Sequence, residues 1–257
     1  MSSLISQIVE SSKVDSSNVA DYSGVSYIKE SGIYSLKIKR AWVIESAKGA
    51  LGIHTEFEGE AMLEYDFWIT NQDKQTFYTK NGKDSPMPSY VDMKKLNYVV
   101  TGNFLTSLSQ LNVSNQLVKT FEYITDPEDE TKKKKVEVEK EVEYILDWKD
   151  KEVDVAIQMA EKEASTKQGD KYVGTGKRAE DKDGKPYLEV NIIGFYNPET
   201  KQTANEMKRE IEAQQINKDK ERLEKVPVRL FKPKGSKPSN TSSSTGGTSA
   251  PKKPQVF

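Results

Sequence analysis

The residues best suited to chemistry in this chain are aromatic and basic side chains gathered around one Asn-Gly turn. They are Phe77, Tyr78, Lys80 and Lys83. An Asn-Gly dipeptide readily takes positive φ at both central turn positions, so the stretch predicts a hairpin with rings and lysines at its tip. Such a tip suits nucleic acid, because bases stack on rings while ammonium groups meet phosphates. The alternative is that Phe77 and Tyr78 only close one end of a barrel.

The stretch that leads into this hairpin has the two-residue period of a strand. One face carries Leu63, Tyr65, Phe67 and Ile69, and the other carries Met62, Glu64, Asp66 and Trp68. A strand of this kind can bury its apolar face and offer the other to a ligand. We therefore include Trp68 among the candidate DNA-binding residues.

A second candidate surface lies on the strand predicted from residue 33 to residue 44. Its apolar face carries Tyr34, Leu36, Ile38, Trp42 and Ile44, and its polar face carries Lys37 and Lys39. Arg40 falls on the apolar face, which predicts a bulge or bend near the middle of the strand. We interpret Trp42 as a core residue. Lys37, Lys39 and Arg40 are candidate phosphate contacts, and the alternative for both lysines is an ordinary solvated strand position.

Signals of catalysis are weak. His54 is the only histidine and there is no cysteine, which excludes multi-histidine and cysteine metal sites and thiolate chemistry. Glu64 and Asp66 could bind a metal ion, but nothing near them in the sequence completes a set of ligands. The glycine-rich residues 169–178 lack the spacing and the Ser or Thr of a phosphate loop. We therefore expect that the chain is not an enzyme and binds neither a metal ion nor a cofactor. A metal-dependent nuclease using Asp66 is the least favoured alternative.

The remaining patterns outline a mainly β (α+β) domain. The strands predicted at 33–44, 51–57 and 62–69 are joined by short turns and make a meander that can close into a small barrel. Residues 86–118 have helical spacing with an interruption near Gly102, and further strands are expected at 136–146, 153–159, 171–178 and 186–196, the last two as a pair. The charge run Asp126–Lys135 predicts a solvated loop.

The C-terminal part begins with a helix signal and ends in a basic segment. Thr203-Ala204-Asn205-Glu206 is a capping box, and the charged helix after it is expected to reach Lys225. Residues 226–257 hold six of the 39 basic residues and none of the 40 acidic ones, within a net charge of −1. Their Ser, Gly and Pro content predicts a flexible tail. Lys252, Lys253 and Phe257 are its candidate partner-binding residues.

The composition favours one good-sized domain with appendages. Of the 257 residues, 35% are hydrophobic and 31% are charged. We expect an N-terminal arm at 1–30, a DNA-binding domain with a C-terminal helix at 31–225, and the flexible tail at 226–257. No apolar run approaches the roughly 20 residues of a membrane span, and the N-terminus lacks the pattern of a signal peptide. A cytoplasmic protein without membrane contact is the expectation.

Several motifs occur in an order that resembles the single-stranded DNA-binding proteins of tailed bacteriophages. The motifs are SGIY (31–34) leading into KIKRA (37–41), SAKGA (46–50), YDFWITN (65–71), FYTKNGK (77–83) with Pro86 and Pro88, and FYNPETKQTANE (195–206). The likeness spans most of residues 31–206. It implies an OB-fold barrel that binds single strands through aromatic and basic side chains, with Tyr78 as the main stacking residue.

The resemblance also implies partners and a biological role. Single-stranded DNA would be bound in an infected host cell during replication, recombination and repair, with phage replication proteins or host RNA polymerase as partners of the tail. Many such proteins end in an acidic tail closed by an aromatic residue, whereas the tail here is basic. The competing hypothesis is a structural or adaptor β-barrel that binds protein through its C-terminal tail.

Overall fold

The computed structural model describes residues 27–126, 129–168 and 171–232, and its largest element is an antiparallel sheet. Five strands follow one another in the order β11-β8-β1-β2-β3. Their bounds are Leu188–Tyr196 (β11), Glu152–Glu161 (β8), Gly32–Glu45 (β1), Leu51–Gly59 (β2) and Leu63–Trp68 (β3). The expectation of a mainly β chain is confirmed. Among the described strands, no backbone pairing joins β3 to β11.

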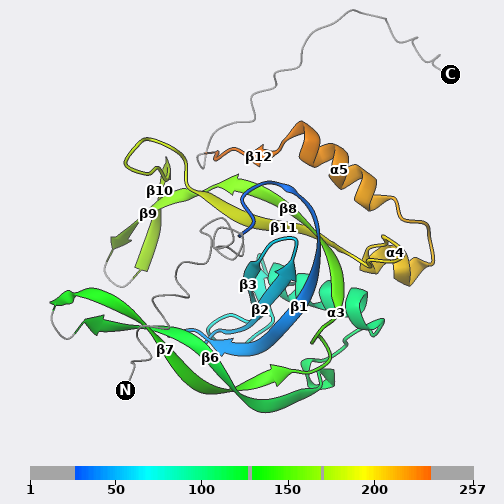
Figure 1. Ribbon diagram of the computed structural model, residues 1–257, viewed down its shortest axis with the longest axis horizontal. Coiled ribbons are helices and arrows are strands. Elements are labelled where there is room, and N and C mark those ends of the chain that lie inside the picture. The colour runs from blue at the N-terminus through cyan, green and yellow to red at the C-terminus, as the bar shows by residue number, and fades with distance from the viewer. Residues whose placement is uncertain (1–26, 127–128, 169–170, 233–257) are drawn as a thin grey trace, which may run out of the picture. The chain divides into compact units, whose positions relative to one another are not determined.

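The predicted three-stranded meander is present, and so is the predicted irregularity in its first strand. β1 pairs with β2 and β2 with β3, both antiparallel. The register between β1 and β2 shifts between Ile38 and Arg40, as expected for a bulge, and β1 curves strongly along its length (Figure 1). The bulge changes which residues point inward, so Ala41 rather than Arg40 continues the buried face.

Trp42 is buried as predicted, but it lies in a different cluster from Leu36 and Ile38. It packs with Val118 and Tyr144, apart from the main core. The sequence pattern placed Trp42 on the same face as Leu36 because side chains alternate between the two faces of a regular strand. A bulge adds one residue, so every residue after it lies on the opposite face from the one that simple alternation predicts.

A long two-stranded ribbon, β6 (Val113–Asp126) with β7 (Asp129–Ile145), leaves the sheet where Tyr144 pairs with Trp42 (Figure 1). Two expectations were wrong here. Residues 113–118 are strand rather than helix, and 129–135 are strand rather than loop. The backbone of Lys134, for example, pairs with that of Ile124. Charged side chains that reach into water do not prevent backbone pairing, so a charge run does not by itself indicate a loop.

Helix α3 (Pro88–Thr101) follows the hairpin β4 (Phe77–Lys80) and β5 (Lys83–Pro86). Pro88 lies in the first turn of the helix, and Gly102 ends it in the left-handed conformation at φ 73°. The expected second helix is only a 3₁₀ turn, Leu108–Gln110. α3 contacts both β3 and β11. Phe67 of β3 and Phe195 of β11 are 6.0 Å apart between ring centroids, so the two ends of the strand order meet in the core.

Trp148, whose role the sequence leaves open, fixes the turn between β7 and β8 to α3. Its ring is fully buried, and its indole N–H donates to Oδ1 of Asn97 at 2.8 Å. The amide of Asn97 in turn donates to the carbonyl of Asn103 at 2.7 Å. A buried polar pair of this kind fixes the position of α3 against the sheet.

The C-terminal helix is split in two. The capping box of Thr203 and Glu206 is present and starts α4 (Ala204–Arg209), and α5 runs from Gln215 to Lys225. Glu210 between them is left-handed, at φ 54°. Glu206 Oε1 accepts the amides of Gln214 and Gln215 at 2.8 Å each, so one carboxylate serves both helix starts. β12 (Val228–Arg229) then pairs parallel with β8.

The chain forms two compact units. Among the described residues, one unit comprises 27–126, 129–160 and Leu188–Arg229, and the other comprises 161–168, 171–187 and 230–232. In the second unit β9 (Glu163–Gln168) pairs with β10 (Lys171–Arg178), so the predicted pairing of 171–178 with 186–196 was wrong. β10 has a nearer antiparallel partner in β9, and β11 instead pairs with β8.

Several expectations fall outside the described residues. These are the N-terminal arm up to residue 26 and the tail from residue 233, with Lys252, Lys253 and Phe257. Within the described part, none of the helices combines the length and apolarity that a membrane-spanning helix requires.

Candidate nucleic-acid interface

The hairpin predicted around Asn81-Gly82 is present, with both turn residues at positive φ, 53° and 71°. Tyr78 is 43% exposed, and Phe77 is half-buried. Lys80 pairs directly with Lys83 across the turn, and both are exposed. The hairpin therefore offers one ring and two ammonium groups to solvent.

The other predicted residues gather on one face of the sheet, where β2 lies between β1 and β3. Directly paired positions across strands point to the same side of a sheet. Lys37 pairs with Glu58, Arg40 with Glu56 and Trp42 with His54. Across β2, His54 pairs with Asp66 and Gly52 with Trp68. A side chain at Gly52 would come within 3.0 Å of the Trp68 ring, so Trp68 covers that glycine.

Every predicted cation on this face has a carboxylate partner. Lys37 Nζ lies 3.0 Å from Glu58, and Lys39 Nζ lies 3.8 Å from the same carboxylate. Arg40 donates to the buried Glu56 at 2.7 Å. A phosphate at this face has to compete with these carboxylates, so the sheet face is less basic than the sequence pattern indicates.

His54 lies at the centre of this charge network. Its Nδ1 is 2.7 Å from Asp66, and its Nε2 is 3.8 Å from Glu56. Burial acts to lower the pKa of His54, but the hydrogen bond to Asp66 and the nearby carboxylate of Glu56 outweigh it and raise the pKa to about 9. Burial likewise acts to raise the pKa of Glu56, but the nearby His54 and the hydrogen bond from Arg40 overcome this effect and lower the pKa to about 2. Paired charges of this kind hold the three strands together and are poor candidates for a general base.

A different surface combines rings with cations, and the sequence patterns did not single it out. It is a groove of about 380 Å³ between α3 and α4, named here the α3–α4 groove. Its rings are Tyr90, Tyr98 and Phe104, and its cations are Lys94, Lys95 and Lys208. Phe104 is 49% exposed, and Tyr98 meets it edge to face at 6.3 Å between centroids.

Two lysines from different helices lie over the same ring. Nζ of Lys94 on α3 is 4.9 Å from the Phe104 centroid, and Nζ of Lys208 on α4 is 4.5 Å from it. Lys94 also lies 5.2 Å from the ring of Tyr90. Cation–π contacts at exposed sites contribute only about 0.5–1 kcal/mol each, so these ammonium groups can move to a phosphate at small cost.

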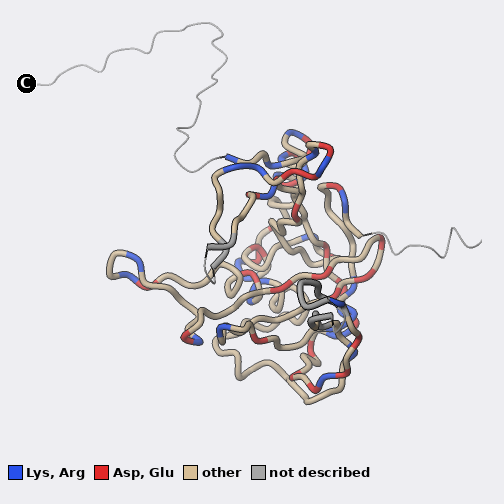
Figure 2. Tube along the Cα trace, turned by 90° about the vertical axis from the view of Figure 1, so that its left-hand side faces the viewer, with Lys and Arg blue, Asp and Glu red and all other residues tan. Residues whose placement is uncertain are grey.

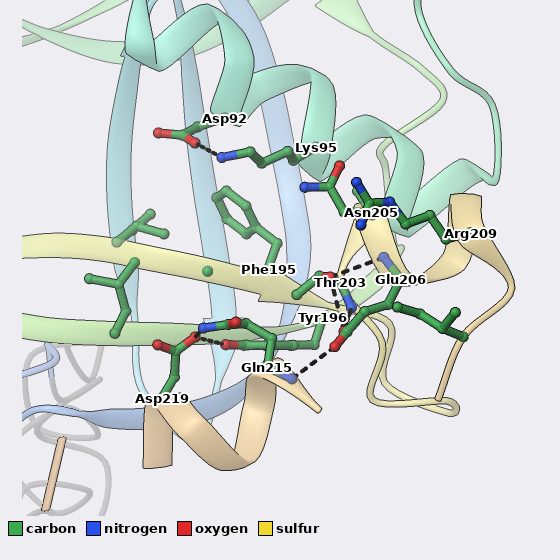
Figure 3. Close-up of a pocket in the computed structure, with 15 residues that line it drawn as sticks. Asp92, Lys95, Phe195, Tyr196, Thr203, Asn205, Glu206, Arg209, Gln215 and Asp219 are labelled. Atoms are coloured by element: carbon green, nitrogen blue, oxygen red, sulfur yellow. Dashed lines mark hydrogen bonds and ion pairs between the residues drawn. The ribbon is translucent and has the colours of Figure 1, made fainter. Parts of the chain in front are cut away.

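A second hollow, of about 290 Å³, is drawn in Figure 3. It continues from the groove, because both are lined by Lys95, Ala204 and Asn205. Arg209 and Lys95 lie at its side, and Phe195 of β11 lies within its wall. Within the described residues the guanidinium of Arg209 has no ion pair or hydrogen bond, whereas the ammonium group of Lys95 bonds to Asp92 at 2.7 Å. The groove and this hollow together carry four cations on two helices.

The acidic groups of this second hollow are occupied by their own neighbours. Asp219 accepts a hydrogen bond from the Tyr196 hydroxyl and another from the amide of Gln215 at 3.1 Å (Figure 3). Burial and Asp219 together raise the pKa of Tyr196. Glu206 accepts hydrogen bonds from backbone amides. Burial acts to raise the pKa of Glu206, but these hydrogen bonds outweigh it and lower the pKa. These carboxylates therefore act in the fold and are not available as catalytic acids.

The hairpin and the groove are continuous. Pro86 lines the groove and pairs directly with Phe77 across the hairpin, and α3 begins two residues after it. By contrast, neither Lys37 nor Trp68 of the sheet face is among the described residues that line the groove. One signal was present in the sequence: Tyr90, Lys94 and Tyr98 repeat every four residues and share one face of a helix.

Among the described residues, no group of acidic or histidine side chains is arranged to hold a metal ion. Basic and acidic positions are interspersed along the described chain (Figure 2). Comparison with protein-family models, with curated proteins and with solved structures finds no match. A function is therefore inferred from the geometry of this surface and from the motif resemblance.

Proposed function

We propose that this chain binds single-stranded DNA with little sequence preference, through the α3–α4 groove and the β4–β5 hairpin. The observation that carries the proposal is Phe104, a half-exposed ring with two lysines from different helices over it. A base that stacks on this ring takes the place of the ammonium groups, which then meet the flanking phosphates. Each stacked base contributes about 1–3 kcal/mol, and every base has a π-face, so such binding tolerates sequence.

The preference for single strands follows from the same rings. Bases in a duplex stack on each other and keep their faces covered, so a duplex can use the lysines but not Phe104 or Tyr90. A single strand can use both. It can also continue from the groove past Pro86 to the hairpin, where Tyr78, Lys80 and Lys83 extend the surface.

The sheet face takes a secondary part in the proposal. Trp68 is half-buried beside Gly52, and Lys37, Lys39 and Arg40 are each paired with a carboxylate. A phosphate gains less from a lysine that already has a counter-ion, since it replaces one negative partner with another. Contacts at this face would therefore add less to affinity than those in the groove.

We also propose that the sheet belongs to an OB-like barrel. The meander β1-β2-β3 is followed by α3, and side chains of β3 and β11 meet at Phe67 and Phe195. With the motif resemblance, this supports a phage protein that coats single strands during replication, recombination and repair. The tail would then bring in a replication protein or host RNA polymerase, with a role in transcription.

Fluorescence anisotropy of a labelled oligo-dT tests the proposal at 50 and 200 mM salt. Phe104→Ala should weaken binding by roughly 5- to 150-fold, the equivalent of about 1–3 kcal/mol. Tyr187→Ala removes an equally exposed ring, 54% exposed, in the other unit and should leave the affinity unchanged. Duplex DNA of the same length should bind more weakly than oligo-dT.

Two results would contradict the proposal. One is the absence of binding at 50 mM salt, which would leave an adaptor protein as the better account. The other is an equal loss of oligo-dT affinity for Phe104→Ala and Tyr187→Ala, which would show that the groove is not part of the binding surface. Circular dichroism of each variant separates loss of affinity from loss of fold.

A further inference from the structure

The β6–β7 ribbon carries an acidic face that no part of the proposed DNA-binding surface uses. Side chains two apart on a strand share a face, so Glu137, Glu139, Glu141 and Glu143 form one row along β7, and all four are exposed. Among the described residues, only Glu137 has a cation, Lys119 at 3.6 Å. Such a row repels phosphates, so a cationic ligand fits it better than nucleic acid does.

Two apolar side chains lie directly opposite this row, with Lys119 between them opposite Glu139. Leu117 of β6 pairs with Glu141 and is 71% exposed, and Phe121 pairs with Glu137 and is 57% exposed. These six residues define the acidic ribbon face: the four glutamates, Leu117 and Phe121. Large apolar groups that lie exposed beside a row of like charges are typical of a protein-binding surface.

A hollow of about 480 Å³ opens beside the same part of the ribbon. Ile44, Leu51 and Phe121 are among its apolar lining residues, and its charged lining residues are three glutamates and one lysine: Glu45, Glu141, Glu143 and Lys140. The hollow has room for one large apolar side chain, and the carboxylates are placed to pair with cations close to that side chain. The matching ligand is a polypeptide segment with several lysines and an aromatic residue near them.

This chain itself contains a segment of that composition. Residues 232–257 hold Lys232, Lys234, Lys237, Lys252 and Lys253 and no acidic residue, and Val256 and Phe257 follow the last lysine pair. Residues 233–257 lie outside the described structure. When fully extended, they span at most about 80–90 Å, which is long enough to reach a neighbouring molecule.

We infer that the acidic ribbon face of one molecule binds the basic segment 232–257 of a second copy of this chain. The lysines pair with Glu139, Glu141 and Glu143, and Phe257 enters the hollow beside Leu51. The interface is heterologous, because the segment of one molecule contacts the ribbon of the next. Such an interface can join many molecules head to tail. It uses none of the residues of the proposed DNA-binding surface and goes beyond that function.

Zero-length carbodiimide cross-linking tests the inference on the full chain, without DNA and at low salt. Equal amounts of unlabelled and ¹⁵N-labelled protein are mixed, cross-linked, digested and analysed by mass spectrometry. We expect cross-links between Glu139, Glu141 or Glu143 and the lysines of 232–253, with hybrid pairs of one light and one heavy peptide. Salt at 500 mM should reduce them at least fivefold, because exposed charges are screened.

Matched variants connect the cross-links to the acidic face. The triple change Glu139→Gln, Glu141→Gln and Glu143→Gln should abolish the rise of sedimentation coefficient with protein concentration. The control Glu212→Gln, Glu221→Gln and Glu224→Gln changes three exposed glutamates elsewhere and should leave that rise intact. Phe257→Ala should weaken self-association without any change of charge. The affinity for oligo-dT, measured separately, should be the same in all of these variants.

Three outcomes would overturn the inference. Absence of ribbon–segment cross-links would show that the surface does not bind this segment. Cross-links confined to light–light and heavy–heavy pairs would assign the segment to its own molecule. Equal self-association of the ribbon triple variant and its control would place the interface elsewhere. Each of these is independent of whether the groove binds DNA.

Discussion

Nζ of Lys208 lies 4.5 Å from the ring centroid of Phe104, and Lys208 follows Phe104 by about a hundred residues in the chain. The ring comes from the segment after α3 and the ammonium group from α4. The ring also has Lys94 of α3 at 4.9 Å. Two cations held at one exposed ring make a place where a base and its phosphates can be bound together. The proposed DNA-binding function rests on this arrangement.

The salt dependence of binding should identify which lysines meet phosphates. For single strands, the logarithm of affinity falls with the logarithm of salt with a slope of about −0.7 per phosphate contact. Lys94→Gln should therefore reduce the steepness of that slope by about 0.7. Lys37→Gln, the matched change on the sheet face, should leave it unchanged because Lys37 is paired with Glu58 at 3.0 Å. Titrations of oligo-dT at four salt concentrations measure both slopes, and the reverse ranking would assign the DNA to the sheet face.

Tyr78 should contribute to binding rather than to folding. It is 43% exposed on a hairpin that leads into α3, so its removal leaves no large cavity. Tyr78→Ala should weaken oligo-dT binding by about 1–3 kcal/mol, and Tyr78→Phe, which keeps the ring, should restore most of the affinity. Thermal unfolding of the same proteins is the check. A lower Tm with unchanged affinity would mean that the ring only closes one end of the domain.

Stability should fall as the pH rises from neutral toward 9 because of His54. A raised folded-state pKa means that the charged form is favoured in the folded protein, so its stabilisation is complete below 6.5 and is lost as the pH rises through about 9. The loss is at most about 1.4 kcal/mol per pH unit for one proton. Urea unfolding at pH 6.5 and pH 9 measures it. His54→Gln should be less stable at pH 6.5 and should show a smaller change between the two pH values; an unchanged pH dependence would mean that the pair with Asp66 is not the cause.

The sequence predicted those features of the fold that depend on only a few adjacent residues. The Asn81-Gly82 turn, the capping box of Thr203 and Glu206 and the bulge before Arg40 all depend on a few adjacent residues, and all are present. Which strands pair was not predictable in the same way. β8 pairs with β1, which lies more than a hundred residues earlier, and β11 pairs with β8 rather than with β10. The charge run before Val136 was misassigned because its strand is set by its partner β6.

The sequence predicted the residue types of the candidate site, aromatic and basic, but not its location between α3 and α4. Alternation correctly puts Lys37 on the polar face of β1, but it carries no information on the facing strand, where Glu58 neutralises it. The pair of Phe104 with Lys208 joins residues from distant parts of the sequence, and no short pattern indicates it. The hairpin residues Tyr78, Lys80 and Lys83 were predicted from the Asn-Gly turn, and the only sequence signal for the groove itself is the repeat of Tyr90, Lys94 and Tyr98 along one helix face.

The most direct test of the central claim is photo-cross-linking with an oligonucleotide that carries 5-iodouracil, followed by mass spectrometry of the protein–DNA adducts. Iodouracil reacts with aromatic side chains against which it stacks, so each adduct reports a ring in contact with a base. We predict adducts at Phe104 and Tyr90 in the groove and at Tyr78 on the hairpin. Adducts confined to Trp68, or to rings of the ribbon such as Phe121, would contradict the assignment of the α3–α4 groove as the DNA-binding surface.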